Sequence, residues 1–193
     1  MSEFLLLILS TALVNNLALT HMVGMTPLMA ISRRWDVARL VAWLTIIVLP
    51  VTSGATTALE QYWLIPAQLD HLTLLVFVFV ITLIVLVFEP LLNHLIPTHA
   101  DDYRLCLPLL LASNTVLGTA LLNSAQQTNI IQALAFGLGS GLGFALLLNL
   151  FASQRERLAG ADVPLPFRGH AIAFISLALT AMALQGLAGL GKP

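Results

Sequence analysis

Six long apolar runs alternate with short polar segments along this chain. The runs cover about residues 4–32, 38–59, 72–95, 104–122, 129–152 and 170–190. A helix needs roughly 20 apolar residues to cross a bilayer, and only helices satisfy the backbone of such runs in lipid. The third run, LLVFVFVITLIVLVF, lacks the apolar–polar alternation of a membrane barrel strand. The pattern therefore predicts an all-α integral membrane protein with six transmembrane helices.

Composition supports this fold class and narrows the possible functions. The chain is 59% hydrophobic and only 9% charged, whereas soluble domains are about 25% charged. A net charge of −1 gives no electrostatic support for binding nucleic acid. We find no catalytic triad, phosphate-binding loop or metal-ligand cluster. We expect one membrane domain over residues 1–193, with no catalytic centre of its own.

The basic residues predict an orientation. Seven arginines follow the first or third run or separate the fifth from the sixth: Arg33, Arg34, Arg39, Arg104, Arg155, Arg157 and Arg168. The one lysine is Lys192, near the C-terminus. Loops 60–71 and 123–128 have no lysine or arginine. By the positive-inside rule, the arginine-bearing loops face the cytoplasm and both termini lie outside. The segment 153–169 is expected to be a cytoplasmic loop, either a docking loop for a partner or an ordinary linker.

Six runs can be divided into two halves of opposite topology, residues 1–97 and 98–193. Inverted repeats of this kind are common in transporters. TPLMA at 26–30 can be laid over NTVLG at 114–118, which pairs Thr26 with Asn114 and places Gly118 in the second half. We therefore expect two inverted three-helix repeats in which the first and fourth helices are broken.

Unusual residues for a simple anchor interrupt the first run, which is about 29 residues long: Asn15, Asn16, Gly24 and Pro27. Asn15 and Asn16 are expected to bond backbone groups freed where the helix opens. Gly24 and Pro27 are expected to start a second short helix, because proline fits a first turn that needs no amide donor. The alternative is a kinked helix with ends that reach the interface.

Two further features are candidates for function or packing. Glu89 in the third run either binds a proton or Na⁺ on a pathway or marks the membrane interface. Gly137 with Gly141, and Gly139 with Gly143, form two GxxxG pairs that predict close helix packing.

Three segments resemble a known membrane family over essentially the whole chain. They are LVNNLALTHMVGMTPLMA, LPLLLASNTVLGTALLN and RERLAGADVPLPFRGHAIAFI. They resemble the A-type subunit of Rnf complexes, and the related subunit of the Na⁺-pumping NADH:quinone reductase is similar. The resemblance implies a place in the bacterial inner membrane, within a complex that couples electron transfer between ferredoxin and NAD⁺ to Na⁺ or H⁺ movement.

The family also implies partners and cofactors. Its A-type and E-type subunits are understood as paralogues of opposite orientation, whose broken helices offer two cysteines each to a shared intramembrane [2Fe–2S] cluster. Iron–sulfur and flavin subunits with FMN, iron–sulfur clusters and riboflavin complete the complex.

This chain departs from the family at both ligand positions, where it has Thr26 and Asn114. Iron–sulfur clusters are held by thiolates and occasionally by imidazole, and the one cysteine, Cys106, lies eight residues before Asn114. We expect this chain to supply no cluster ligand. Either the complex lost the cluster, or the partner holds it alone, or the chain is a paralogue without electron transfer.

The leading hypothesis is a core membrane subunit of an Rnf-type complex. Two alternatives are a stand-alone secondary transporter built on inverted repeats and a non-redox membrane scaffold.

Overall fold

The computed structural model describes residues 2–14, 16–20, 24–32, 34–95, 114–126 and 129–188. Within these ranges the chain is helical and contains no strand. The longer helices are joined by short π- and 3₁₀-helical segments, labelled η. In chain order the elements are α1 (Ser2–Leu9), η1 (Ser10–Val14), α2 (Leu17–Thr20), α3 (Met25–Ile31), α4 (Trp35–Leu59), η2 (Glu60–Leu64), α5 (Ile65–Ala67), η3 (Asp70–Leu72), α6 (Thr73–Leu95), α8 (Asn114–Ala125), α9 (Ile130–Ala159), η5 (Leu165–Phe167) and α10 (His170–Ala188).

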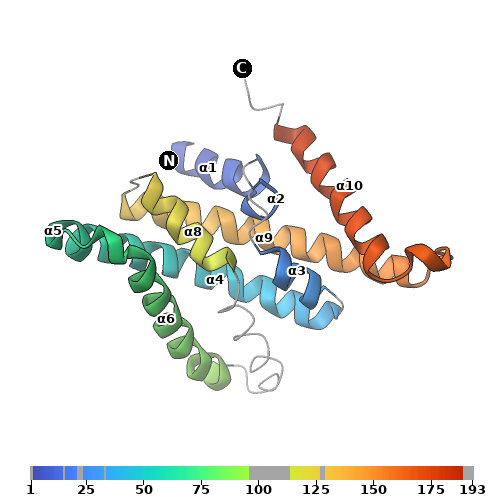
Figure 1. Cartoon of the computed structure of the whole chain (residues 1–193), viewed down its shortest axis with the longest axis horizontal. Coiled ribbons are helices and arrows are strands. Elements are labelled where there is room, and N and C mark those ends of the chain that lie inside the picture. The colour runs from blue at the N-terminus through green and yellow to red at the C-terminus, as the bar shows by residue number, and fades with distance from the viewer. Residues whose placement is uncertain are drawn as a thin grey trace.

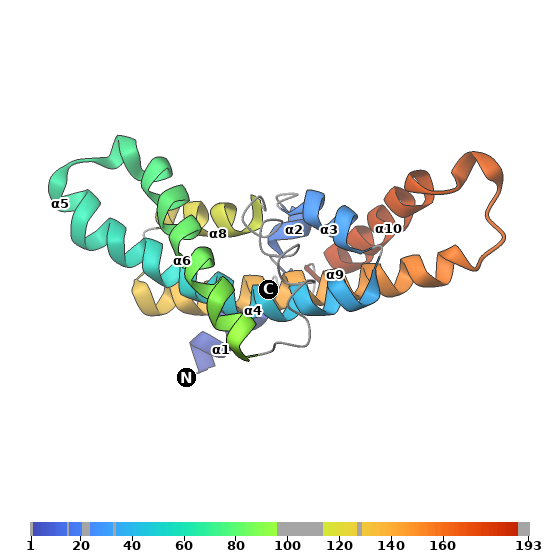
Figure 2. The same cartoon turned by 90° about the horizontal axis from the view of Figure 1, so that it is seen from below.

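Two long helices form the centre of the molecule. α4 and α9 lie side by side and run in opposite directions, and α6 and α10 turn back from opposite ends of this pair at an angle to it (Figures 1 and 2). Helical backbone continues from α4 through α5, so Trp35–Ala67 spans 33 residues, and α9 spans 30. Both are long and apolar enough to cross a bilayer, and shorter apolar helices cover Thr73–Phe88 and His170–Gly186. The described chain is thus the all-helical, apolar structure of an integral membrane protein, while the count of six spans stays a prediction.

The glycines of α9 let two neighbours approach its backbone from different sides. A methyl group at Gly137 would lie 2.7 Å from Pro50 Cα, and one at Gly141 would lie 3.0 Å from the Thr45 carbonyl, both on α4. At Gly139 it would lie 2.9 Å from the Ile8 carbonyl of α1. The close packing predicted from the two GxxxG pairs is confirmed. Gly137 and Gly141 pack against α4, whereas Gly139 and Gly143 pack against α1 and η1.

The core is built where α9 meets α4 and α3. Its largest fully buried side chains come mainly from these helices and include Phe144, Phe151, Leu147, Leu148, Leu28, Val41 and Val48. A second, smaller cluster around Phe77 and Ile81 joins α6 to α8 and α4. Close packing of this kind fixes the helices relative to one another.

Large apolar side chains remain exposed on the outer helices. Phe79 of α6 is 67% exposed and Met182 of α10 is 60% exposed, and similar residues follow along both helices. A water-soluble monomer rarely leaves contiguous apolar surface of this extent uncovered. The helix of the third run, α6, therefore has the apolar outer surface that lipid requires.

One boundary differs from the sequence-based expectation. The fifth run was expected to end near residue 152, with a connection over 153–169, but α9 continues to Ala159. The extra turns contain Arg, Glu, Leu and Ala, which favour helix, and Arg155 within them bonds the end of α3. The connection is therefore confined to residues 160–169.

We expect Gly137→Ala to lower the stability of the protein by about 1–3 kcal/mol, because the methyl group would force α4 and α9 apart. Gly186→Ala on α10 is the matched control, since nothing lies within 4 Å of a methyl group there. That substitution should be neutral or stabilising, as alanine favours helix. Thermal unfolding in detergent checks both variants. Equal effects at the two positions would contradict the packing of α9 on α4.

Candidate functional site at the helix break

The first apolar run is divided into separate helical pieces. α1 passes into the π-helical η1, which ends at Val14; α2 covers Leu17–Thr20, and α3 begins at Met25. Short π-helical turns are rare and occur often at functional sites. The Asn16 carbonyl starts α2 by accepting from the backbone N–H groups of Leu19 and Thr20 at 3.0 and 2.9 Å.

Asn16 connects this interruption to α9. Its buried side-chain amide donates to the Ala12 carbonyl at 3.1 Å and to the Gly143 carbonyl at 3.0 Å. A methyl group at Gly143 would lie 2.9 Å from the same amide nitrogen, so glycine is needed there for Asn16 to reach α9. The side chain satisfies backbone carbonyls where the helix changes geometry, which is the role that polar residues take at interruptions within a membrane.

Gly24 brings the start of α3 against α8. It precedes α3 with φ 89° and ψ 11°, a left-handed conformation that glycine adopts without strain. A methyl group here would overlap the hydroxyl of Thr115, in the first turn of α8, and would lie 2.8 Å from Phe144 of α9. The beginnings of α3 and α8, far apart in sequence, therefore meet.

Thr26 and Asn114, the two positions paired in the sequence, lie next to the residues that make this contact. Thr26 is the second residue of α3, two residues after Gly24, and Asn114 directly precedes Thr115. Pro27 lies in the first turn of α3, and Gly118 is half-buried in the second turn of α8. Asn114 itself is exposed.

Other candidate residues lie elsewhere. Glu89 is in α6, whose helix continues through Pro90 to Leu95. Asn15 and Cys106 lie outside the described residues, as does the segment before Asn114 in which the second break was expected.

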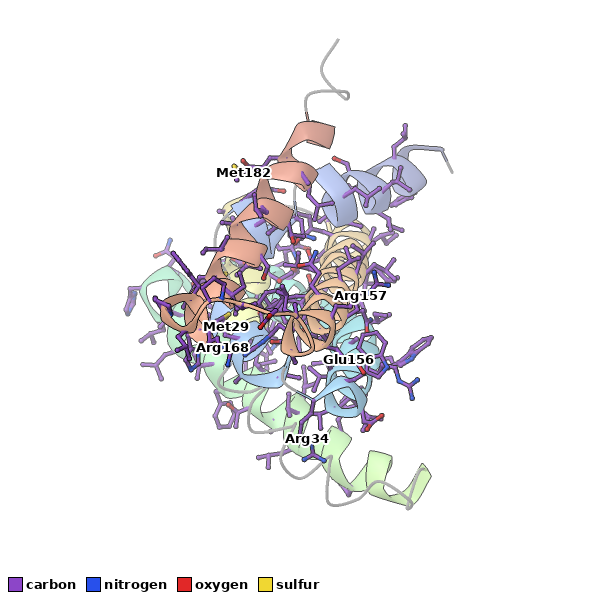
Figure 3. The ribbon with its side chains drawn as sticks, turned by 90° about the vertical axis from the view of Figure 1, so that its right-hand side faces the viewer. Met29, Arg34, Glu156, Arg157, Arg168 and Met182 are labelled. Carbon is purple, nitrogen blue, oxygen red and sulfur yellow. The ribbon has the colours of Figure 1, made fainter. Side chains whose placement is uncertain are left out.

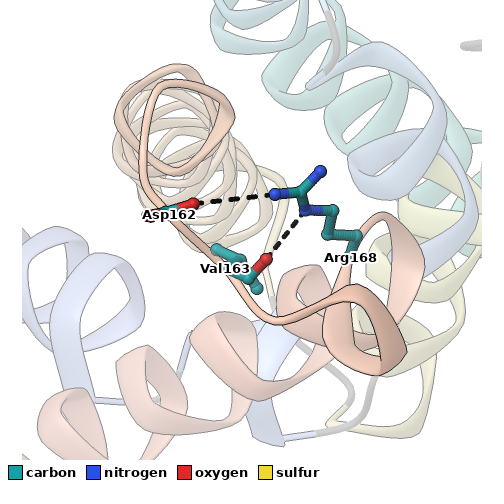
Figure 4. A network of polar contacts seen from close by, with 3 residues as sticks. All are labelled: Asp162, Val163 and Arg168. Atoms are coloured by element: carbon teal, nitrogen blue, oxygen red, sulfur yellow. Dashed lines mark hydrogen bonds and ion pairs between the residues drawn. The ribbon is translucent and has the colours of Figure 1, made fainter.

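Arginines gather at one end of the molecule. Figure 3 views this end and labels Arg34, Arg157 and Arg168, which lie around the start of α4, the end of α9 and the loop before α10. Arg155 donates to the Met29 carbonyl and to the Ser32 hydroxyl, each at 2.9 Å. In the loop, Arg168 donates to the Val163 carbonyl at 2.7 Å and lies 3.7 Å from exposed Asp162 (Figure 4). Such an exposed ion pair contributes little stability.

Sequence reasoning missed a second polar feature, at the opposite end of α4. Its members form what we call the α4–α8 polar row: Ser53, Thr57, Glu60, Asn123 and Ser124. Asn123 donates to the Ser53 hydroxyl, Ser124 donates to the Glu60 carboxylate, and Ser53 donates to the Ala133 carbonyl of α9 at 2.8 Å. The signal in the sequence was TSGATT at 52–57, a run of small and hydroxyl residues inside an apolar helix.

Comparison with known proteins places the chain in a family. A family model described as "Rnf-Nqr subunit, membrane protein" matches residues 4–191. The chain belongs to the Rnf-Nqr subunit family. Curated Rnf-Nqr relatives, each named as the A-type subunit of an ion-translocating oxidoreductase complex, match over the full length of both chains. Their identity to this chain is 42% in Shewanella sediminis, 41% in Actinobacillus pleuropneumoniae serotype 5b and 42% in Tolumonas auensis.

Thr26 and Asn114 do not carry the side chains that usually hold an iron–sulfur cluster. A threonine hydroxyl at position 26 and an asparagine amide at 114 stand where the resemblance implies thiolates, and neither is a usual cluster ligand. In the part of the chain that the structure describes, no group of three or more His, Cys, Asp or Glu side chains could hold a metal ion.

Gly24→Ala should destabilise the protein by more than Gly169→Ala. Both glycines have positive φ, 89° and 84°, but nothing lies within 4 Å of a methyl group at Gly169. Gly169→Ala therefore measures the backbone strain alone, about 1 kcal/mol. Gly24→Ala adds the overlap with Thr115 and Phe144, for a total of about 2–4 kcal/mol.

Thr115→Ala, combined with Gly24→Ala, should recover part of that loss in a double-mutant cycle. Thermal unfolding of the four variants in detergent gives the coupling. Strict additivity would show that the starts of α3 and α8 do not touch.

Proposed function

We propose that this chain is a core membrane subunit of an ion-translocating electron-transfer complex that moves electrons between ferredoxin and NAD⁺ and couples them to Na⁺ or H⁺ movement. Family membership and the names of its curated relatives support this proposal. Its partners would be the paralogous E-type membrane subunit, together with the iron–sulfur and flavin subunits. Its place would be the bacterial inner membrane.

The observation that carries the proposal is the packing of Gly24 against Thr115. It joins the first interruption to the start of α8, so that the positions of Thr26 and Asn114 lie on either side of one contact. In a protein built from two inverted repeats, the interruptions of both halves are expected to meet near the midplane. The antiparallel α4 and α9, with α6 and α10 returning at opposite ends (Figure 2), agree with such repeats.

The side chains at positions 26 and 114 also bear on which cofactor this chain could bind. With hydroxyl and amide groups in place of thiolates, we propose that the chain supplies no ligand to an intramembrane [2Fe–2S] cluster. FMN, iron–sulfur clusters and riboflavin would belong to partner subunits. This chain would then provide the interface with its paralogue and part of the ion path, with Asn15, Asn16 and Glu89 as the candidates on that path.

The cluster proposal predicts the iron content of the purified pair. This chain, co-expressed with its E-type paralogue, should contain no [2Fe–2S] cluster. The combined substitution of Thr26→Cys and Asn114→Cys should restore about two irons and two labile sulfides per pair. Iron and sulfide assays with EPR of the reduced sample provide the measurement, and each single substitution serves as a control.

Three results would contradict parts of this scheme. About two irons in the unsubstituted pair would show that ligands come from other residues. A stable double-cysteine pair without iron would mean that positions 26 and 114 are not the ligand positions. Failure to form a pair at all would favour a stand-alone transporter.

The arginine-rich end should face the cytoplasm. Arg34, Arg157 and Arg168 lie together at that end (Figure 3), and basic residues are retained on the cytoplasmic side. Reporter tags fused to either terminus should then report a periplasmic position, whereas a tag inserted in the loop 160–169 should report a cytoplasmic one. A cytoplasmic signal from one terminus would overturn the even number of spans.

A further inference from the structure

We propose that the α4–α8 polar row is a binding site for a sodium ion. The proposal deepens the proposed function, because it rests on this chain lining part of an ion path, and it names a place for the ion. None of its residues belongs to the helix break. The site lies at the end of α4 that is far from the arginines. The proposed orientation assigns this end of α4 to the outer side of the membrane.

The row lies along one face of α4. Ser53, Thr57 and Glu60 are spaced i, i+4 and i+7, a spacing that places side chains one above the other on a helix. Asn123 bonds Ser53, and Ser124 bonds Glu60. Thr57 lies between these two cross-links on the same face of α4 and is buried.

The Thr57 hydroxyl is the observation that points to a ligand. Thr57 is 2% exposed. Its hydroxyl oxygen is the only buried side-chain nitrogen or oxygen without a hydrogen-bond partner among the described residues. Neighbouring threonines on α4 do not share this state: Thr56 donates to the Thr52 and Ser53 carbonyls at 2.8 and 3.1 Å. An unpartnered polar group inside a protein is unfavourable and calls for an unseen water or ion.

The chemistry of the row selects the ion. Its side chains offer oxygen atoms from hydroxyls and a carboxylate, which are the ligands that hard cations prefer. Glu60 is the only carboxylate among them, and it is half-buried, whereas Ser53 and Asn123 are fully buried. One carboxylate balances the charge of a monovalent ion, while a divalent ion would leave an uncompensated charge in a buried site, which is strongly unfavourable.

The α4–α8 polar row runs from an accessible end at Glu60 to a buried end at Ser53 and Asn123. Glu60 stands where α4 passes into the π-helical η2, at the accessible end, and the remaining groups lead inward to the Ala133 carbonyl on α9. An ion that enters at Glu60 would meet Thr57 next and the Ser53–Asn123 pair last. The inner end lies one helical turn from Gly137, where a methyl group would lie 2.9 Å from Ser53 Cβ.

The test is sodium-dependent stabilisation of the purified complex, measured by thermal unfolding without electron donors. Sodium chloride is titrated against choline chloride at constant ionic strength. We expect a saturable stabilisation by Na⁺ in the unsubstituted protein. Thr57→Val should raise the half-saturating Na⁺ concentration about tenfold, as expected for the loss of one ligand to a charged group, and Glu60→Gln should abolish saturation.

Thr56→Val is the matched control. Thr56 is the neighbouring buried threonine, and its hydroxyl bonds only its own helix. Its substitution should leave the half-saturating Na⁺ concentration unchanged. In choline alone, Thr57→Val should be at least as stable as the unsubstituted protein, because it removes a buried hydroxyl that has no partner.

Absence of a saturable Na⁺ effect, an equal effect of choline, or equal weakening by Thr56→Val and Thr57→Val would overturn the proposal. If Glu60→Gln does not fold, the two threonine variants still decide. Electron transfer from ferredoxin to NAD⁺ is measured on the same preparation. Sodium binding without electron transfer would support the site and count against the proposed function, and the reverse result would do the opposite.

Discussion

The approach of other backbones to α9 is the constraint on which the rest of this structure depends. Gly137 and Gly141 admit α4 on one side, and Gly139 and Gly143 admit α1 and η1 on the other. In lipid, helices gain little from burying apolar side chains against each other, so association depends on close packing and on hydrogen bonds between helices. α9 supplies both at Gly143. This residue has no side chain to clash with Asn16, and its carbonyl accepts a hydrogen bond from the Asn16 amide.

The interruption of the first helix follows from the same contact. A helix that opens at membrane depth exposes carbonyl groups that have no water to bond. Asn16 bonds the Ala12 carbonyl of its own segment together with the Gly143 carbonyl, so the interruption is held in place by α9 rather than left to lipid. From there the chain reaches Gly24, whose positive φ redirects it into α3 beside Thr115. Two glycines and one asparagine therefore bring distant segments of the chain together.

The sequence was informative where the pattern is long or chemically unusual. Apolar runs predicted the positions of α4 and α9, and the two GxxxG pairs predicted close packing. Asn16, Gly24 and Pro27 were recognisable because each is unfavourable inside an ordinary membrane helix. The segment that each glycine pair contacts was not predictable: no local pattern says that Gly139 faces Ile8 while Gly141 faces Thr45.

The α4–α8 polar row was missed for a related reason. Serine and threonine are common in membrane helices because they usually bond their own backbone, as Thr45, Thr52 and Thr56 do. Only the three-dimensional arrangement distinguishes Thr57 from them.

The persistence of the break without thiolates bears on its purpose. An interrupted helix sacrifices backbone hydrogen bonds, and Gly24 in its left-handed conformation would be unnecessary in a continuous helix. If the break existed only to hold a cluster, a chain without the ligands would gain stability by closing it with ordinary helix-forming residues. This chain instead has Asn16 bonded across the interruption and Gly24 packed on α8. The contacts that hold the break in this chain are therefore made by an asparagine amide and a glycine, and neither depends on iron.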